Sequence, residues 1–342
     1  MNDLKVRPVT VDGGRAAVPA EARLTAVGTI VTALLLFGPL AGVAIAAISL
    51  FGHGVTILDL GLGVGFYAIT GHGISVGYHR MLAHRACKPT RAAKIALAVA
   101  GSMGFEGALN GWVAIHRRHH AYTDRPGDPH SPHLHGNSTS DRIRGAFHAH
   151  MGWLFRQQPT EIARWAPDLA ADRDLVRISA MFPFFCVVSL ALPTAIGWAV
   201  TGTYAGAVGG FVWGGLVRVF LLQHSTFAVN SACHIWGQRP FKTRVDDRAT
   251  NFAPLAVLAM GDNWHNLHHS NPRFARHGVE RHQLDSTARV IRILEVAGLL
   301  NDVHWPTPAT LQARRVGETT DVPPYDSGQV VDGARDEELV PG

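Results

Sequence analysis

The amino-acid sequence predicts an all-α integral membrane protein with four transmembrane helices and a helical cytosolic cap that holds a histidine-rich metal site. Its composition is apolar for a soluble protein, because 47% of the residues are hydrophobic and only 17% are charged. The charges are unevenly placed, and long tracts hold none. The sequence also has 20 histidines, several of them in three short groups. The uncharged tracts predict the spans, and the histidine groups predict the metal site.

The first two spans follow a polar segment, residues 1–20, which is expected to be a disordered N-terminal tail. Residues 24–51 contain no charge, and a span needs about 20 apolar residues. After a glycine-rich turn, residues 55–78 form the second span. At ~1.5 Å per residue, this helix is longer than the ~30 Å hydrocarbon core. Its far end, which carries His79, is therefore expected to protrude into water.

Two further spans are predicted at residues 178–200 and 204–228, joined by a turn too short to hold other structure. Prolines are tolerated in a span because neighbouring groups can satisfy the carbonyls that a proline frees. The folded domain is expected to cover residues 21–305. Residues 306–342, whose last part is rich in Pro, Gly, Asp and Glu, are expected to form a disordered C-terminal tail.

One mixed apolar helix is expected over residues 90–120, either at the membrane interface or packed in the cytosolic cap. An amphipathic helix is expected over residues 286–300, on the membrane surface or in the core of the domain. Lys and Arg lie in the N-terminal tail and between the second and third spans, whereas the two short turns between paired spans hold none. Cytoplasmic loops carry an excess of Lys and Arg. The chain is therefore expected to be a multi-pass protein with both termini and the metal site in the cytosol.

The net charge of +5 arises from basic residues at the edges of the apolar tracts. Because no basic stripe with interleaved aromatic residues is present, no nucleic-acid partner is expected. The basic excess is expected to face the lipid bilayer or an acidic redox partner. Cys87, Cys186 and Cys233 lack the spacing of zinc or redox sites and are expected to be reduced structural thiols.

Three histidine groups point to metal chemistry. In the central group, the i, i+3, i+4 spacing places three imidazoles on one face of a helix, and the same spacing returns near residue 265. A third group lies upstream, and one more histidine follows the fourth span. The candidate metal ligands are His79, His84, His116, His119, His120, His234, His265, His268 and His269. Any one group is as often a surface or core feature, but all of them together predict a metal site.

These histidines are too many for one ion, so two ions are the economical number. Neutral imidazole suits Zn, Cu, Fe and Ni. A zinc pair used for hydrolysis needs a carboxylate base nearby, and the histidine groups contain none. A nitrogen-ligated pair beside lipid, on the reducing side of the membrane, fits iron that activates dioxygen.

The motifs at residues 79–84, 116–120 and 265–269 resemble the three histidine boxes of the membrane fatty acyl desaturases. The likeness is strongest to the acyl-CoA, stearoyl-CoA-type delta-9 branch. Residues 230–234 resemble the extra histidine element of that branch, and residues 150–154 resemble its loop after the second box. The likeness spans roughly residues 55–300.

The resemblance implies two iron ions held by the nine histidines, with Asn230 approaching one iron through water. Trp112 and Thr226 match positions that flank the bend of the acyl tunnel in that family. Glu106 stands where relatives have Gln, and Phe227 replaces a usual Trp, so both are candidate tunnel residues.

The activity implied is dioxygen-dependent insertion of a cis delta-9 double bond into a saturated chain on CoA or another acyl carrier. Two electrons would come from a separate donor of the ferredoxin, flavoprotein reductase or cytochrome b5 type, because the sequence lacks the haem-binding signature of a fused cytochrome b5 domain. Arg218 matches a family arginine on the fourth span, and a charge at that position is not expected to face lipid.

Several alternatives stay open at this level. A di-iron hydroxylase or alkane monooxygenase would use the same iron chemistry, and a membrane metal transporter ranks lower because the histidine groups lie at the span ends. Asp124 and Asp128 are expected either to orient ligand imidazoles or to form a turn. Most of the other eleven histidines are expected to be structural or solvated.

Overall fold

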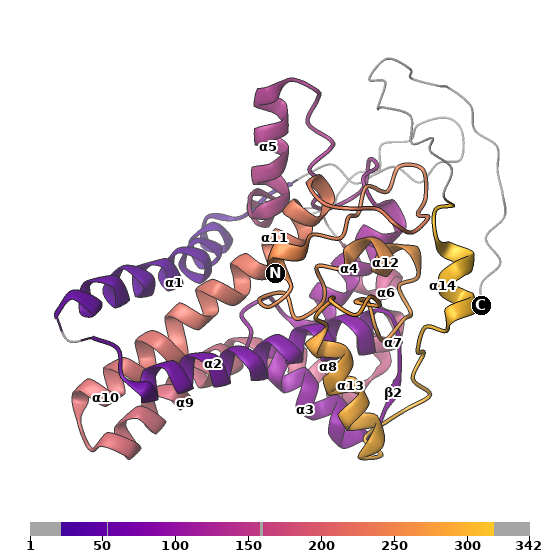
Figure 1. Cartoon of the computed structure of the whole chain (residues 1–342). Coiled ribbons are helices and arrows are strands. Elements are labelled where there is room, and N and C mark those ends of the chain that lie inside the picture. The colour runs from indigo at the N-terminus through magenta and orange to yellow at the C-terminus, as the bar shows by residue number, and fades with distance from the viewer. Residues whose placement is uncertain (1–21, 53, 158–159, 318–342) are drawn as a thin grey trace.

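The computed structural model describes residues 22–52, 54–157 and 160–317. Four of its helical stretches are long and apolar enough to cross a membrane: Ala26–Ile48, Ile57–Ala83, Phe182–Thr201 and Tyr204–Ile235. They project together from a helical cap, and the first three each pack against the fourth (Figure 1). Many of their apolar side chains are exposed, as expected of a surface that faces lipid. The predicted all-α fold, with four candidate spans and a helical cap, is confirmed.

The spans are composed of α1 (Ala26–Gly52), α2 (Ile57–His72), η1 (Gly73–Ala83), α9 (Phe182–Thr201), α10 (Tyr204–Gly209), η3 (Gly210–Val217) and α11 (Arg218–Ile235). The other helices are α3 (Arg91–Ser102), α4 (Leu109–Tyr122), α5 (Thr139–His150), η2 (Gly152–Phe155), α6 (Ile162–Trp165), α7 (Pro167–Ala171), α8 (Arg173–Ala180), η4 (Ala253–Leu255), α12 (His265–Ser270), α13 (Ser286–Val296) and α14 (Pro308–Arg314). Two short antiparallel strand pairs join β1 (Ala22–Arg23) to β3 (Arg156–Gln157) and β2 (Lys88–Pro89) to β4 (Leu300–Asn301).

The span bounds differ from the predicted ones at the cap side. The second and fourth spans continue to Ala83 and Ile235, so both carry histidines into the cap. The third span begins at Phe182 rather than at residue 178, because α8 ends before it. Pro183 explains this break, since it lacks the N–H that would continue the earlier helix and is tolerated in the first turn of the new one.

The single helix predicted over residues 90–120 is wrong, because the structure has two helices, α3 and α4, separated by residues 103–108. In this loop Phe105 and Gly107 have φ angles of 65° and 107°. A residue with positive φ cannot continue a right-handed helix. The break lets α4 leave the direction of α3 and bring its histidines to the ends of the spans.

The C-terminal tail predicted over residues 306–342 is also partly wrong. Residues 308–314 form α14, and the segment after it pairs with the cap through the bridge between Phe241 and Arg315. The Lys242 N–H donates to the Arg314 carbonyl at 2.7 Å. The rest of that prediction and the N-terminal tail at residues 1–20 lie outside the described residues.

Close backbone contact and one buried cation fix the span ends. A Cβ atom on Gly73 would lie 2.2 Å from the Gly101 nitrogen, so only glycine allows α3 to cross η1 so closely. Arg218 is 1% exposed and donates to the carbonyls of Met103 and Ser189 at 3.0 and 2.9 Å. As expected, its charge does not face lipid; it ties the fourth span to α9 and to the loop before α4. The three cysteines are buried and free, as predicted.

Candidate metal centre

Nine buried or half-buried imidazoles gather where the cap meets the span ends. They fall into two groups, in each of which the possible ligand atoms lie within 4.8 Å of one another. The five-histidine group consists of His79, His84, His116, His120 and His268. The four-histidine group consists of His119, His234, His265 and His269. These are the nine candidate ligands named from the sequence.

A π-helix brings the first two ligands together. His79 and His84 are five residues apart, and in an α-helix side chains at that spacing point in different directions. Residues 73–83 form a π-helical segment, η1, in which hydrogen bonds join residues five apart. The His84 N–H donates to the His79 carbonyl at 3.1 Å, directly across this spacing. The wider turn therefore brings the two imidazoles together edge to face, with their centroids 5.0 Å apart.

The i, i+3, i+4 motif on α4 contributes ligands to both groups. His116 and His120, four residues apart, belong to the five-histidine group, while His119 belongs to the four-histidine group. On α12 the pattern is reversed, because the i, i+4 pair enters the four-histidine group and His268 enters the other. The face shared by three imidazoles is thus wide enough to serve two neighbouring sites.

The inward ring nitrogens suit metal ions. Four pairs of Nε2 atoms lie 2.7–3.0 Å apart: His84 with His116, His79 with His268, His120 with His268, and His265 with His269. A metal–nitrogen distance of about 2.1 Å places adjacent ligands at right angles about 3 Å apart. The Nε2 atoms of His119 and His234 are buried and have no hydrogen-bond partner. Two ions would satisfy these nitrogens, so the residues present fit a two-metal centre.

Carboxylates and a carbonyl hold the outer nitrogens of the four-histidine group. The Nδ1 atoms of His119, His234 and His269 lie 2.9–3.0 Å from carboxylate oxygens of Asp128, Asp124 and Asp247, respectively. The Nδ1 atom of His265 lies 3.2 Å from the backbone carbonyl of Asp262. Such bonds put the ring proton on Nδ1 and leave Nε2 bare for a metal.

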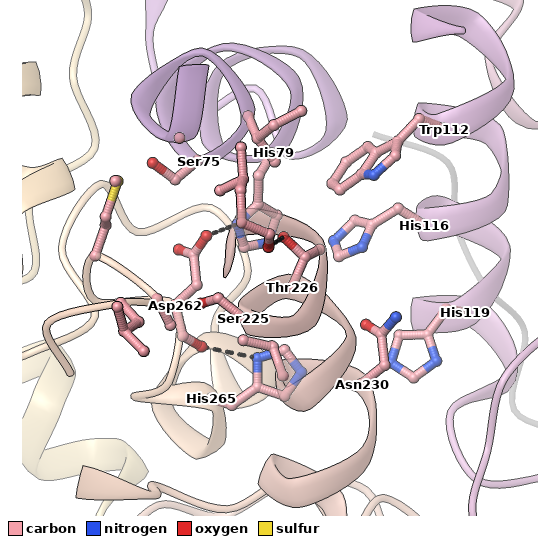
Figure 2. Close-up of a pocket in the computed structure, with 17 residues that line it drawn as sticks. Ser75, His79, Trp112, His116, His119, Ser225, Thr226, Asn230, Asp262 and His265 are labelled. Carbon is pink, nitrogen blue, oxygen red and sulfur yellow. Dashed lines mark hydrogen bonds and ion pairs between the residues drawn. The ribbon is translucent and has the colours of Figure 1, made fainter. Parts of the chain in front are cut away.

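The five-histidine group has fewer such supports. Within the described part of the chain, His79 is its only member with a recorded carboxylate bond, at 3.2 Å from Asp262. The other oxygen of Asp262 accepts from the fully buried Arg80 at 3.1 Å. Asp262 therefore touches one histidine of each group, through its carboxylate and through its backbone carbonyl, as the dashed lines of Figure 2 show.

The charge states agree with this arrangement. Burial acts to raise the pKa of Asp124, Asp128 and Asp247, but the partner histidine of each holds its pKa below the usual value. Burial and the neighbouring histidines lower the pKa of His116 and His268 well below its usual value. For these carboxylates and these two imidazoles, those are the states that metal binding requires. Burial acts to lower the pKa of His234, but Asp124 holds it above its usual value, so a metal at this ring would have to displace a proton.

Asp124 and Asp128 both bond imidazoles of the four-histidine group, and together they also form a turn. Besides bonding His234, Asp124 has a φ of 58° and donates its N–H to Asp128 at 2.8 Å, so the pair also forms the turn after α4. Ser131 and the Arg248 N–H fill further acceptor positions of Asp124 at 2.7 and 2.9 Å.

Four residues at the centre were missed from the sequence: Asp247, Asp262, His130 and His277. The His130 ring stacks on His119 at 4.3 Å, and burial first, then His119, lowers its pKa to about 3. His277 is fully buried 4.5 Å from the His268 ring, and neither of its nitrogens has a hydrogen-bond partner. Position near a histidine group could have suggested Asp262, but nothing in the sequence distinguishes the other three.

Two cavities meet beside the imidazoles. The smaller, shown in Figure 2, has a volume of about 50 Å³ and the larger about 370 Å³. Trp112, His116, Thr226 and Asn230 line both. Of the remaining candidate tunnel residues, Glu106 and Phe227 line the larger cavity.

Burial raises the pKa of Glu106 well above its usual value, against a smaller opposing effect of Thr226. A carboxyl that is much harder to ionise than usual therefore lies in the wall of the larger cavity.

Comparison with known proteins finds similarity to enzymes that act on fatty acyl chains. The family model for fatty acid desaturases matches residues 56–297. A hex-5-enoyl-[acyl-carrier protein] acetylenase of Moorena producens is 36% identical over 280 residues, which cover 81% of this chain and 87% of the relative. Delta-9 acyl-lipid desaturase 2 of Arabidopsis thaliana is 33% identical, with coverages of 73% and 76%. An acyl-CoA C20 Delta5-desaturase of Anemone leveillei is 35% identical, with coverages of 70% and 72%.

Proposed function

The chain belongs to the fatty acid desaturase family, and from this premise we propose that it inserts a cis double bond into a saturated fatty acyl chain at a histidine-held pair of iron ions. The observation that carries the proposal is the pair of imidazole groups, whose bare nitrogens converge beside an apolar slot. In the overall reaction the acyl chain loses two hydrogens. Dioxygen is reduced to two waters with these hydrogens, two further electrons and two protons. Bound iron would supply the oxidant that an unactivated methylene requires.

The nine histidines would hold the iron, five around one ion and four around the other. Asn230, which lines both cavities, would approach one ion through water. Trp112 stacks on His116 with ring centroids 5.0 Å apart, and so forms a flat wall between the imidazoles and the slot. With Thr226 opposite, it would hold the acyl chain at a fixed depth and exclude bulk water from the reacting carbons.

For the substrate we propose an acyl-CoA with the double bond at the ninth carbon, with other carriers as the alternatives to test. The names of the three relatives include an acyl-carrier protein, an acyl-lipid and an acyl-CoA substrate, so they favour no single carrier. The distribution of Lys and Arg supports a cytosolic metal site. There a separate ferredoxin, flavoprotein reductase or cytochrome b5 type of donor would supply the electrons.

The test is expression of the full chain in a host that lacks unsaturated fatty acid synthesis but has a working electron donor. We expect new monoenes two mass units lighter than the saturated chains, and iron in the purified protein. Products that gain one oxygen instead would identify a hydroxylase. Iron-loaded protein that produces neither change with any of the three carriers would contradict the proposal.

A further inference from the structure

The two cavities adjoin at the imidazoles, where they share four lining residues, and we refer to them together as the acyl slot. Trp112 and Thr226 lie at this junction, together with His116 and Asn230. An acyl chain that reacts beside the imidazoles must therefore place one part in each cavity. The two parts differ in size, about 370 Å³ against about 50 Å³.

The carrier end of the chain fits only the larger cavity. Its lining includes Arg156 and Thr160, polar residues of the cap. The surface of the smaller cavity is mostly apolar, and its lining includes Ile74 of the second span and Leu222 of the fourth span beside the histidines. Its volume corresponds to roughly three to five water-sized groups. The smaller cavity therefore suits the methyl end of an acyl chain.

Met260 lines the smaller cavity and lies directly against Gly71 of α2. A Cβ atom on Gly71 would lie 2.4 Å from the Met260 methyl carbon and 2.8 Å from its sulfur. The methionine side chain thus occupies the space that any larger residue on α2 would take. It is 5% exposed, so it is enclosed between the span and the cap.

The backbone of Met260 is held in place from two sides. Its carbonyl accepts from the Thr287 N–H at the start of α13, at 3.1 Å. Two residues earlier, the Leu258 carbonyl accepts from the Tyr67 hydroxyl of α2, at 2.7 Å. Met260 has a φ of 55°, a conformation that a non-glycine residue adopts only when its surroundings fix it. The backbone position from which the Met260 side chain extends is therefore fixed.

We propose that Met260, seated on Gly71, is the specificity-determining residue that ends the acyl slot and limits how many carbons extend beyond the reacting pair. This inference rests on the proposed desaturase function, since it concerns the far end of the same slot. It predicts that the volume of residue 260, and not only the position of the carrier, decides which chain lengths react.

The experiment compares the monoenes that the full chain and its variants make from saturated acyl chains of graded length. Met260→Ala leaves a non-glycine residue at the same positive φ, so the backbone strain is unchanged, but it opens the end of the slot. Each added methylene in an apolar pocket changes kcat/KM by about tenfold or more. We expect the ratio of kcat/KM for a chain two carbons longer to that for the preferred chain to rise by at least about tenfold. Gly71→Ala should shift the preference toward shorter chains, because its methyl group takes space from the same cavity.

Met103→Ala is the matched control, because Met103 is also buried but lines neither cavity. It should leave the chain-length profile unchanged. Iron content, measured on each purified variant, shows whether the metal centre is intact. If Met260→Ala is inactive, Gly71→Ala tests the proposal instead: a shift toward shorter chains supports it, and an unchanged chain-length profile contradicts it.

An unchanged length profile in the active variants would overturn the role of Met260. Absence of any double bond from the iron-loaded wild-type protein would instead contradict the proposed function.

Discussion

The five-histidine group and the four-histidine group differ in what holds the outer side of their imidazoles. Every member of the four-histidine group has its Nδ1 atom against a carboxylate or a backbone carbonyl. In the five-histidine group, within the described residues, a recorded carboxylate bond reaches His79 alone. An outer acceptor fixes the tautomer, orients the ring and raises its basicity. One group is therefore prepared by the protein before metal binds, while the other depends more on packing between rings and on its extra ligand.

Removal of one ligand should give the largest contrast between the groups. His269→Ala leaves three imidazoles in its group, whereas His84→Ala leaves four in the other. We expect His269→Ala to lose one of the two proposed ions and all turnover, and His84→Ala to retain more iron. Metal analysis of the purified variants tests this. Equal iron loss from both variants would contradict the comparison.

Asp247→Asn tests the outer support without removing a ligand. Asp247 bonds His269 at 2.9 Å, and loss of such a partner typically weakens metal affinity by about 10- to 100-fold. An asparagine amide that faces Nδ1 would also favour a proton on the inward nitrogen. Chelator titration of the iron-loaded protein measures the effect. Asp174→Asn, which removes an ion pair with Arg91 on the cap, is the control and should not change iron retention.

His277→Ala should give a smaller effect on the five-histidine group. His277 lies against His268, and the Nδ1 atom of His268 is buried with no hydrogen-bond partner. We expect iron affinity to fall by about tenfold or less, since the change removes packing rather than a direct bond to a ligand. The exposed His282 in the same loop provides the control, His282→Ala. If His277→Ala weakens iron binding more than Asp247→Asn, the five-histidine group depends on an outer support comparable to that of its neighbour.

The smallest effect should come from Glu106, a buried carboxyl with no histidine partner. Its pKa is raised in the folded protein, so folding above pH 4.5 requires uptake of a proton. Glu106 therefore costs stability above pH 4.5, increasingly until the folded pKa is reached, and costs none well below it. Glu106→Gln should raise Tm at pH 7 by about 2–4 °C for each kcal/mol removed. Thermal melts at pH 4 should show no such gain, and a lower Tm at pH 7 would refute the assignment.

Residue chemistry was sufficient to predict that these nine histidines gather at one place, because few structures other than a metal site explain so many histidines at these spacings. It could not divide them between two groups. The i, i+3, i+4 rule places His116, His119 and His120 on one face, but their distribution depends on where α12 approaches α4. The spacing of His79 and His84 makes sense only in a π-helix, which no hydrophobic pattern in the sequence reveals.

The carboxylates that bond the histidines could not be predicted from the sequence either. Asp247 lies 22 residues from His269, and Asp124 lies 110 residues from His234. Such separations carry no local signal, so the partners follow only from the assembled fold. The spans, by contrast, were predictable because length and apolarity are properties of single segments. The third span was misplaced because Pro183 ends the preceding helix, and the second and fourth spans continue further into the cap than their apolar pattern indicates.

The origin of the ligands along the chain also constrains how the protein matures. Four members of the five-histidine group precede residue 121, so they leave the ribosome together, before the second pair of spans is made. The four-histidine group takes members from α4, α11 and α12, and cannot be complete until the last of these is in place. Since nascent chains fold from the N-terminal side first, uptake of the two proposed ions would be sequential: four histidines could bind the first ion early, and α12 would then add His268 to that group and complete the other.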